Sequence, residues 1–135
     1  MIRRLDDRTS VSGQFRPEEI AGLAERGIAM VVNNRPDGEE PGQPLAADIE
    51  AAAEAAGMSY RHVPIIRGIG PADVAAMRDA LHAAGDGQTL AFCRSGNRSA
   101  LAWALAMRED GASAEEIAEK VTAAGFDVTP IAHLL

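Results

Sequence analysis

The sequence predicts an α/β domain over residues 1–135, built on a mostly parallel sheet of about four to five strands with helices on both faces. Three observations lead to this prediction. Short apolar runs at residues 28–33, 59–65 and 89–93 have the length and composition of buried strands. Each run follows a helix-like segment that ends at a glycine. With 47% hydrophobic residues, the 135-residue chain suffices for one core and is short for two.

The first half of the chain supplies two helix and strand pairs. "TSVSGQ" at residues 9–14 predicts an edge strand. In the helix expected at residues 16–27, Pro17 suits the first turn and Gly27 marks the end. A second helix over residues 45–57 leads into the strand at residues 59–65.

The second half continues the alternation. Apolar residues three and four apart predict a helix over residues 71–85, followed by the strand at residues 89–93. The segment at residues 98–109 is apolar nearly all round and predicts a buried helix. Residues 113–125 and 129–135 predict two further helical segments.

Three loops leave the carboxyl ends of these strands, and parallel strands place such ends at one edge of the sheet. The ligand site is expected at that edge. The loops read "NRPDGEEPGQP", "IRGIGPAD" and "CRSGNRS".

Charge and composition exclude several classes of function. The net charge of −7 disfavours broad binding to nucleic acid or to an anionic membrane. The one cysteine forms no internal disulfide, and no Cys or His cluster has metal-ligand spacing, so no metal or other cofactor is expected. The first residues lack the apolar core of a signal peptide, which predicts a cytoplasmic location.

The loop after the strand at residues 89–93 is the candidate site. Cys93 would lie over the positive end of the following helix, where backbone N–H groups around Ser95, Gly96 and Asn97 can form an anion-binding nest. That field favours a nucleophilic thiolate. The alternative is a small buried thiol with no chemistry, but the agreement of strand, glycine, arginine and helix favours the nucleophile.

The remaining residues of this loop have expected roles as well. The planar fork of Arg98 suits two oxygens of a tetrahedral anion, and Ser99 can donate a hydrogen bond to the sulfur. Arg94 serves either to recruit an anion or as a solvated surface charge. Arg35, after the strand at residues 28–33, either attracts an anion or forms an ion pair with Glu39 or Glu40.

Two resemblances bear on these residues. "CRSGNRS" resembles the active-site loop of rhodanese-type sulfurtransferases, in which a cysteine carries sulfane sulfur as a persulfide. Together with "SVSGQ" and "NNRPDGEEPGQP", the longer segment "CRSGNRSALAW" resembles a small bacterial phosphatase-like domain that is also found fused to β-lactamase-fold hydrolases. This resemblance covers nearly the whole chain. It implies the fold of dual-specificity tyrosine phosphatases, and it points to a β-lactamase-fold hydrolase as a partner.

Loop spacing and acid chemistry separate sulfur transfer from phosphate chemistry. Four residues lie between Cys93 and Arg98, whereas tyrosine-phosphatase loops have five, so the cradle is smaller. Cleavage of a phosphate ester also needs a proton donor for the leaving group, and such a donor raises the rate by about 10²–10⁴-fold. The candidates are Asp37, which also suits a turn, and Asp73, which also suits a helix start. Sulfur transfer between thiolates needs no acid.

The sequence therefore predicts first a sulfurtransferase that takes sulfane sulfur from a small anionic donor onto Cys93 and passes it to a thiol acceptor. The alternative is a dual-specificity or tyrosine-type phosphatase with a phosphocysteine intermediate. A second alternative is a non-catalytic module in which the cradle at residues 93–99 only binds an anion.

Overall fold

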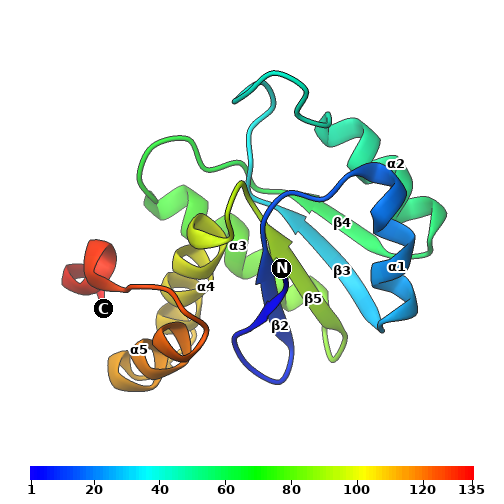
Figure 1. Ribbon diagram of the computed structural model, residues 1–135. Coiled ribbons are helices and arrows are strands. Elements are labelled where there is room, and N and C mark those ends of the chain that lie inside the picture. Colours follow the sequence, from blue (N-terminus) through cyan, green and yellow to red (C-terminus); the bar gives the residue numbers. More distant parts are fainter.

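The computed structural model describes residues 1–135 and contains a five-stranded sheet with helices on both faces (Figure 1). Its order is β1-β2-β5-β3-β4, in which β1 is antiparallel to β2 and all other pairs are parallel. The predicted fold class is confirmed. The strands are β1 (Arg3–Arg4), β2 (Thr9–Ser12), β3 (Ile28–Asn33), β4 (Ser59–His62) and β5 (Gln88–Phe92).

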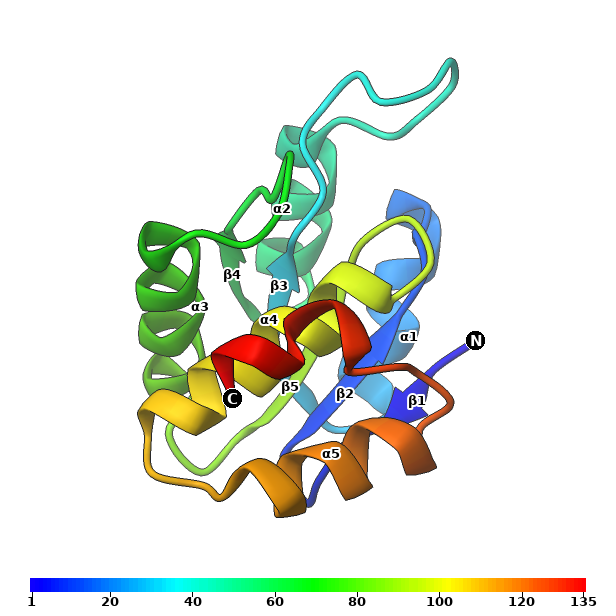
Figure 2. The same ribbon diagram turned by 90° about the vertical axis from the view of Figure 1, so that its left-hand side faces the viewer.

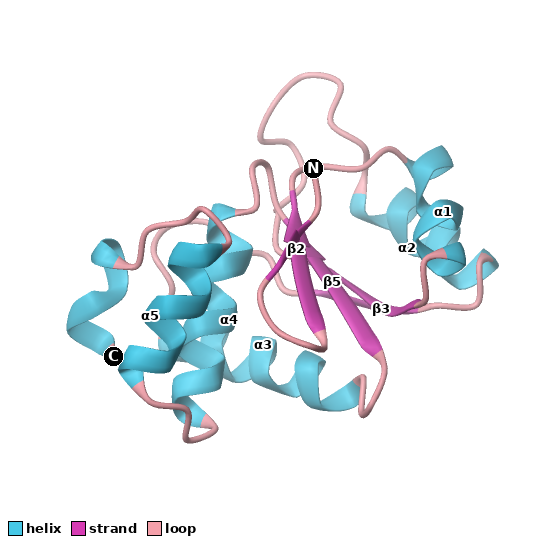
Figure 3. Cartoon of the chain, turned by 60° about the horizontal axis from the view of Figure 1, so that its bottom comes forward, coloured by secondary structure: helices cyan, strands magenta, loops and turns pink.

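The helices form two layers (Figure 3). On one face lie α1 (Ile20–Glu25) and α2 (Ala46–Ala55), and on the other lie α3 (Pro71–Ala83), α4 (Asn97–Glu109) and α5 (Ala114–Ala123). Two 3₁₀ helices, Pro17–Glu19 and Thr129–Leu134, complete the set. No helix has the length and apolar character needed to cross a membrane.

The strands differ from the sequence prediction in two places. The segment expected at the edge, β2, lies inside the sheet, because the two exposed residues of β1 pair with its outer side. A short charged strand protects such an edge from further pairing. The strand predicted over residues 59–65 ends at His62, although the N–H of Val63 still donates to the carbonyl of Asn33 at the end of β3, and that of Ile65 to the carbonyl of Asn34.

Apolar packing fixes α4 most firmly of all the helices. Residues 99–106 of this helix are all buried, and Trp103 is 1% exposed. The larger of two apolar clusters joins α4 to the sheet, α3 and α5, while the smaller lies under α1 and α2. Burial of a side chain such as Leu101 or Leu105 contributes about 1.5–3 kcal/mol, so the first turn of α4 has a rigid support.

Candidate active site

The site lies at the carboxyl edge of the parallel strands, where the loops after β2, β3, β4 and β5 meet (Figure 2). Backbone hydrogen bonds join three of them. The Cys93 N–H donates to the Ser12 carbonyl at 3.3 Å, and the Asn34 N–H donates to the Phe92 carbonyl at 2.8 Å. Gly13 lies so close to the Cys93 loop that a Cβ atom there would be 2.8 Å from the Arg94 carbonyl oxygen. Backbone contacts therefore hold three loops against one another, at residues 13–14, 34–45 and 93–97.

Cys93 lies at the bottom of its loop with its sulfur directed to the start of α4. Its side chain is buried, and the Gly96 N–H donates to Sγ across 3.1 Å. Gly96 has φ +94°, a left-handed conformation that costs other residues about 1–2 kcal/mol. A donor N–H and the start of α4 therefore both lie at the sulfur. The Gly96 N–H is the one backbone donor bonded to this sulfur, and Ser95 and Asn97 lie exposed in the same loop.

Arg98 approaches the same sulfur from the first turn of α4. Its Nη1 donates to Glu39 at 2.8 Å and to the Ile65 carbonyl at 2.9 Å, and its Nη2 donates to Glu39 at 2.8 Å. A guanidinium has five N–H donors, so the Nε–H and one Nη2–H stay available on the same side. The sequence predicts that such a pair binds an anion. The hydrogen bond to Glu39, with a smaller contribution from Cys93, raises the pKa of Arg98.

Glu39 orients this arginine, a contact that the sequence analysis did not predict. Its carboxylate receives both Arg98 hydrogen bonds and a third from Arg35 Nε at 2.8 Å. The Arg98 hydrogen bonds lower the pKa of Glu39 to about 2, although burial acts in the opposite direction. Two glutamates in the loop after β3 were the available signal, because that loop shares its sheet edge with the cysteine loop.

Arg35 is a buried cation rather than an open anion receptor. Its side chain is 1% exposed, and besides Glu39 it binds Gln14 through Nη1 at 3.1 Å. Its Nη2 lies 3.0 Å from Glu40, an ion pair without the alignment of a hydrogen bond. Glu40 also lies 3.4 Å from the exposed Arg94. The ion-pair alternative for Arg35 is thus the one present in the structure.

Ser99 differs from its expected role. Its hydroxyl donates to Asn34 Oδ1 at 2.7 Å, so its one proton is not directed to the sulfur. The Asn34 amide in turn donates to the Val63 carbonyl at 3.0 Å. Both side chains are fully buried, and together they tie α4 to the loops after β3 and β4. Ser99 is therefore a positioning residue in this structure, and Asn34 is its partner, which sequence reasoning missed.

The two candidate proton donors both stabilise helix starts. Asp37 accepts the backbone N–H of Ala46 at 2.8 Å, at the first residue of α2. Asp73 accepts the Gly70 N–H at 2.9 Å, at the start of α3. These are the turn and helix-start alternatives raised by the sequence. Neither carboxylate is hydrogen-bonded to a residue of the cysteine loop.

Comparisons with known proteins agree with this architecture. A β-lactamase hydrolase-like protein of Xylella fastidiosa is 38% identical over 126 residues, which are 92% of this chain and 29% of that protein. A proposed phosphatase of Neisseria meningitidis is 32% identical and superposes with a TM-score of 0.82, covering 98% of this chain and 94% of that chain. The kinase-associated phosphatase, solved with a serine in place of its catalytic-site cysteine, is 17% identical, with a TM-score of 0.71 over 92% of this chain and 82% of that chain.

The sheet and the cysteine and arginine loop at its edge have the tyrosine-phosphatase-like fold of these solved structures. The family model for the phosphatase-like domain of β-lactamase hydrolase-like proteins matches residues 1–112. The chain therefore belongs to this family. It spans less than a third of the length of the Xylella relative.

Proposed function

We propose that this protein is a cysteine-dependent phosphatase in which the Cys93 thiolate attacks the phosphorus of a small anionic phosphate ester. The S–P bond of a phosphocysteine forms as the P–O bond to the ester group breaks, and the leaving oxide then takes a proton from water. A water molecule next attacks the phosphorus, which breaks the S–P bond, releases inorganic phosphate and restores the thiolate. One observation carries this proposal. The Gly96 N–H on the sulfur and the free side of Arg98 converge in a cradle that suits phosphoryl oxygens.

The carboxylates narrow the substrate class. Asp37 and Asp73 are tied to helix starts, and Glu39 is held ionised by two arginines. Leaving groups that need no proton, such as aryl oxides, are therefore the preferred ones, because alkoxides depend on a general acid.

Sulfur transfer is the second candidate, and two observations favour it. The loop has four residues between Cys93 and Arg98, one fewer than tyrosine-phosphatase loops, and both candidate acids, Asp37 and Asp73, are bonded to helix starts. In this reaction the thiolate attacks sulfane sulfur, as in thiosulfate, so that sulfite leaves and a Cys93 persulfide forms. A thiol acceptor then removes the sulfur. A β-lactamase-fold hydrolase is the proposed partner for either product, since such proteins contain this domain.

One experiment separates the candidates. The parent protein and Cys93→Ser are assayed in parallel for p-nitrophenyl phosphate hydrolysis and for thiosulfate-dependent transfer to a thiol, with intact mass measured after exposure to thiosulfate. Cys93-dependent phosphate release without a gain of mass supports the phosphatase. A gain of about 32 Da, one sulfur atom, on the parent alone supports persulfide chemistry. Strong anion binding by a protein inactive in both assays would identify a non-catalytic module.

A further inference from the structure

A cavity of about 330 Å³ lies beside Arg98, on the helix layer of α3, α4 and α5. Three segments enclose it: the loop after β4, the beginning of α4 and the C-terminal 3₁₀ helix Thr129–Leu134. Figure 2 shows this last helix crossing the start of α4, close to the edge where the strand loops meet. We call this cavity the Arg98 pocket.

The Arg98 pocket has the chemistry of a site for an apolar group attached to an anion. No carboxylate lines it, although the chain carries a net charge of −7. The polar side chains in its wall are Arg98 and His133. The others are apolar: Ile65, Ile69, Leu101, Pro130, Ile131 and Leu134.

Arg98 and Ile65 connect this pocket to the cysteine cradle. The Ile65 carbonyl accepts a hydrogen bond from Arg98 Nη1 at 2.9 Å, while the Ile65 side chain, 1% exposed, forms part of the pocket wall. The free side of the guanidinium is the predicted seat of the anion. A substituent on an anion bound there has an apolar surface to enter on the other side of the same arginine.

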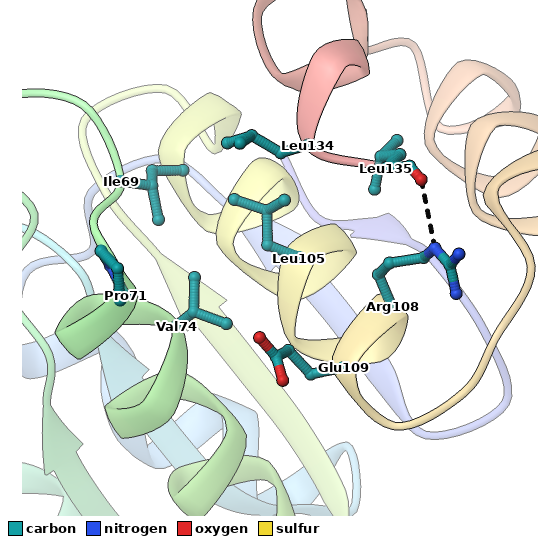
Figure 4. A pocket seen from close by; sticks show the side chains of 8 residues that line it. All are labelled: Ile69, Pro71, Val74, Leu105, Arg108, Glu109, Leu134 and Leu135. Carbon is teal, nitrogen blue, oxygen red and sulfur yellow. Dashed lines mark hydrogen bonds between the residues drawn. The ribbon is translucent and has the colours of Figure 1, made fainter.

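The apolar surface continues along α4. A second cavity of about 490 Å³ shares Ile69 and Leu134 with the Arg98 pocket. Figure 4 shows these two side chains with Val74 and Leu105 around one space. Ligand sites for small molecules are mostly apolar cavities of about 300–1,000 Å³ with a few placed polar groups, which describes both cavities.

We propose that the Arg98 pocket receives the apolar body of the substrate, so that the preferred substrates are aryl phosphates that carry an aliphatic substituent, while alkyl phosphates bind at the same place as ligands. This inference rests on the proposed anion seat at Cys93 and Arg98. Arg98, which the pocket shares with that seat, and the absence of a carboxylate favour such a ligand over a protein segment.

The test measures binding of butyl, hexyl and octyl phosphate to Cys93→Ser by calorimetry, in the presence and absence of a second substitution. Leu134→Glu places a carboxylate at the pocket wall at a position that is 52% exposed, where folding tolerates it. Leu45→Glu is the matched control, because Leu45 is 54% exposed and lines neither cavity.

We expect the dissociation constant to fall by about two- to fourfold for each added methylene, the size of effect that burial of a CH₂ group produces. The control should keep this dependence, and Leu134→Glu should abolish it while butyl phosphate still binds. Equal affinity for all three phosphates would overturn the pocket and leave the anion seat intact. If none of the three phosphates binds, both the pocket and the anion seat are overturned. Sedimentation measures the oligomeric state of the same variants. If Cys93→Ser forms a dimer that Leu134→Glu dissociates and Leu45→Glu does not, a second copy of the chain occupies this face, and the pocket proposal is overturned.

Discussion

Arg98→Lys tests the anion fork directly. Arg98 uses three of its N–H donors on Glu39 and the Ile65 carbonyl, and two remain for a substrate. A lysine ammonium has three N–H donors on one nitrogen and cannot hold the same partners and still present a planar pair. At least one hydrogen bond to the anion is therefore lost.

The size of the effect follows from that count. Removal of one donor from a preorganised oxyanion site lowers kcat by about 10²–10³, or about 2.7–4 kcal/mol of transition-state stabilisation. We expect this loss in Arg98→Lys for turnover of p-nitrophenyl phosphate and of thiosulfate. Cys93 should still react with iodoacetamide, because the Gly96 N–H and the start of α4 are unchanged.

Arg94→Lys is the matched control. Arg94 is 69% exposed and makes one ion pair, 3.4 Å from Glu40, and exposed pairs contribute about 0.2–1 kcal/mol. Its substitution should lower kcat by less than about fivefold. If Arg98→Lys also stayed within about fivefold of the parent while circular dichroism showed a native fold, the fork would have no role in the reaction.

Three further predictions concern the surroundings of the fork. Gly96→Ala forces a side chain onto φ +94° and should cost about 1–2 kcal/mol in urea unfolding while slowing alkylation of Cys93; an unchanged alkylation rate would contradict the role of this N–H. The pKa of Glu39, about 2 in the fold against an ordinary value of 4.5, means that its ion pairs stabilise the protein fully above pH 4.5 and progressively less as the pH falls to 2. Glu39→Gln should therefore lose less stability than the parent between those two pH values, and parallel urea midpoints would refute the ion-pair assignment. Asp37→Asn and Asp73→Asn should each keep turnover within about fivefold, because both carboxylates stabilise helix starts; a loss above tenfold in aryl phosphate hydrolysis by either variant would identify a proton donor.

The sequence predicted the fold and the cysteine loop well because both depend on local signals. Apolar runs between glycine-terminated helices indicate parallel strands, and parallel strands have their carboxyl ends at one edge of the sheet, which placed Cys93 and Arg35 near each other. Gly96 in a left-handed turn before α4 follows from residue type alone.

The side-chain partners could not be predicted, because they depend on how two loops distant in sequence meet. Glu39 and Arg98 lie 59 positions apart, and Ser99 and Asn34 lie 65 positions apart. A serine hydroxyl near the sulfur could donate to more than one acceptor. In the structure it donates to the buried side-chain oxygen of Asn34, and the sequence does not indicate this choice. The place of β2 inside the sheet depended in the same way on two arginines whose pairing no local pattern indicates.

The two sides of the site are held by different forces, and this has a consequence for its response to dissolved salt. Apolar contacts of α4 hold the cysteine loop, whereas ion pairs of Glu39 and Glu40 with three arginines hold the loop at residues 34–45. Mobile ions shorten the reach of exposed charges from about 8 Å at 0.15 M to about 3 Å at 1 M and leave apolar packing intact. Concentrated salt therefore weakens the exposed pair between Glu40 and Arg94 and loosens this loop, while Cys93 and α4 keep their positions.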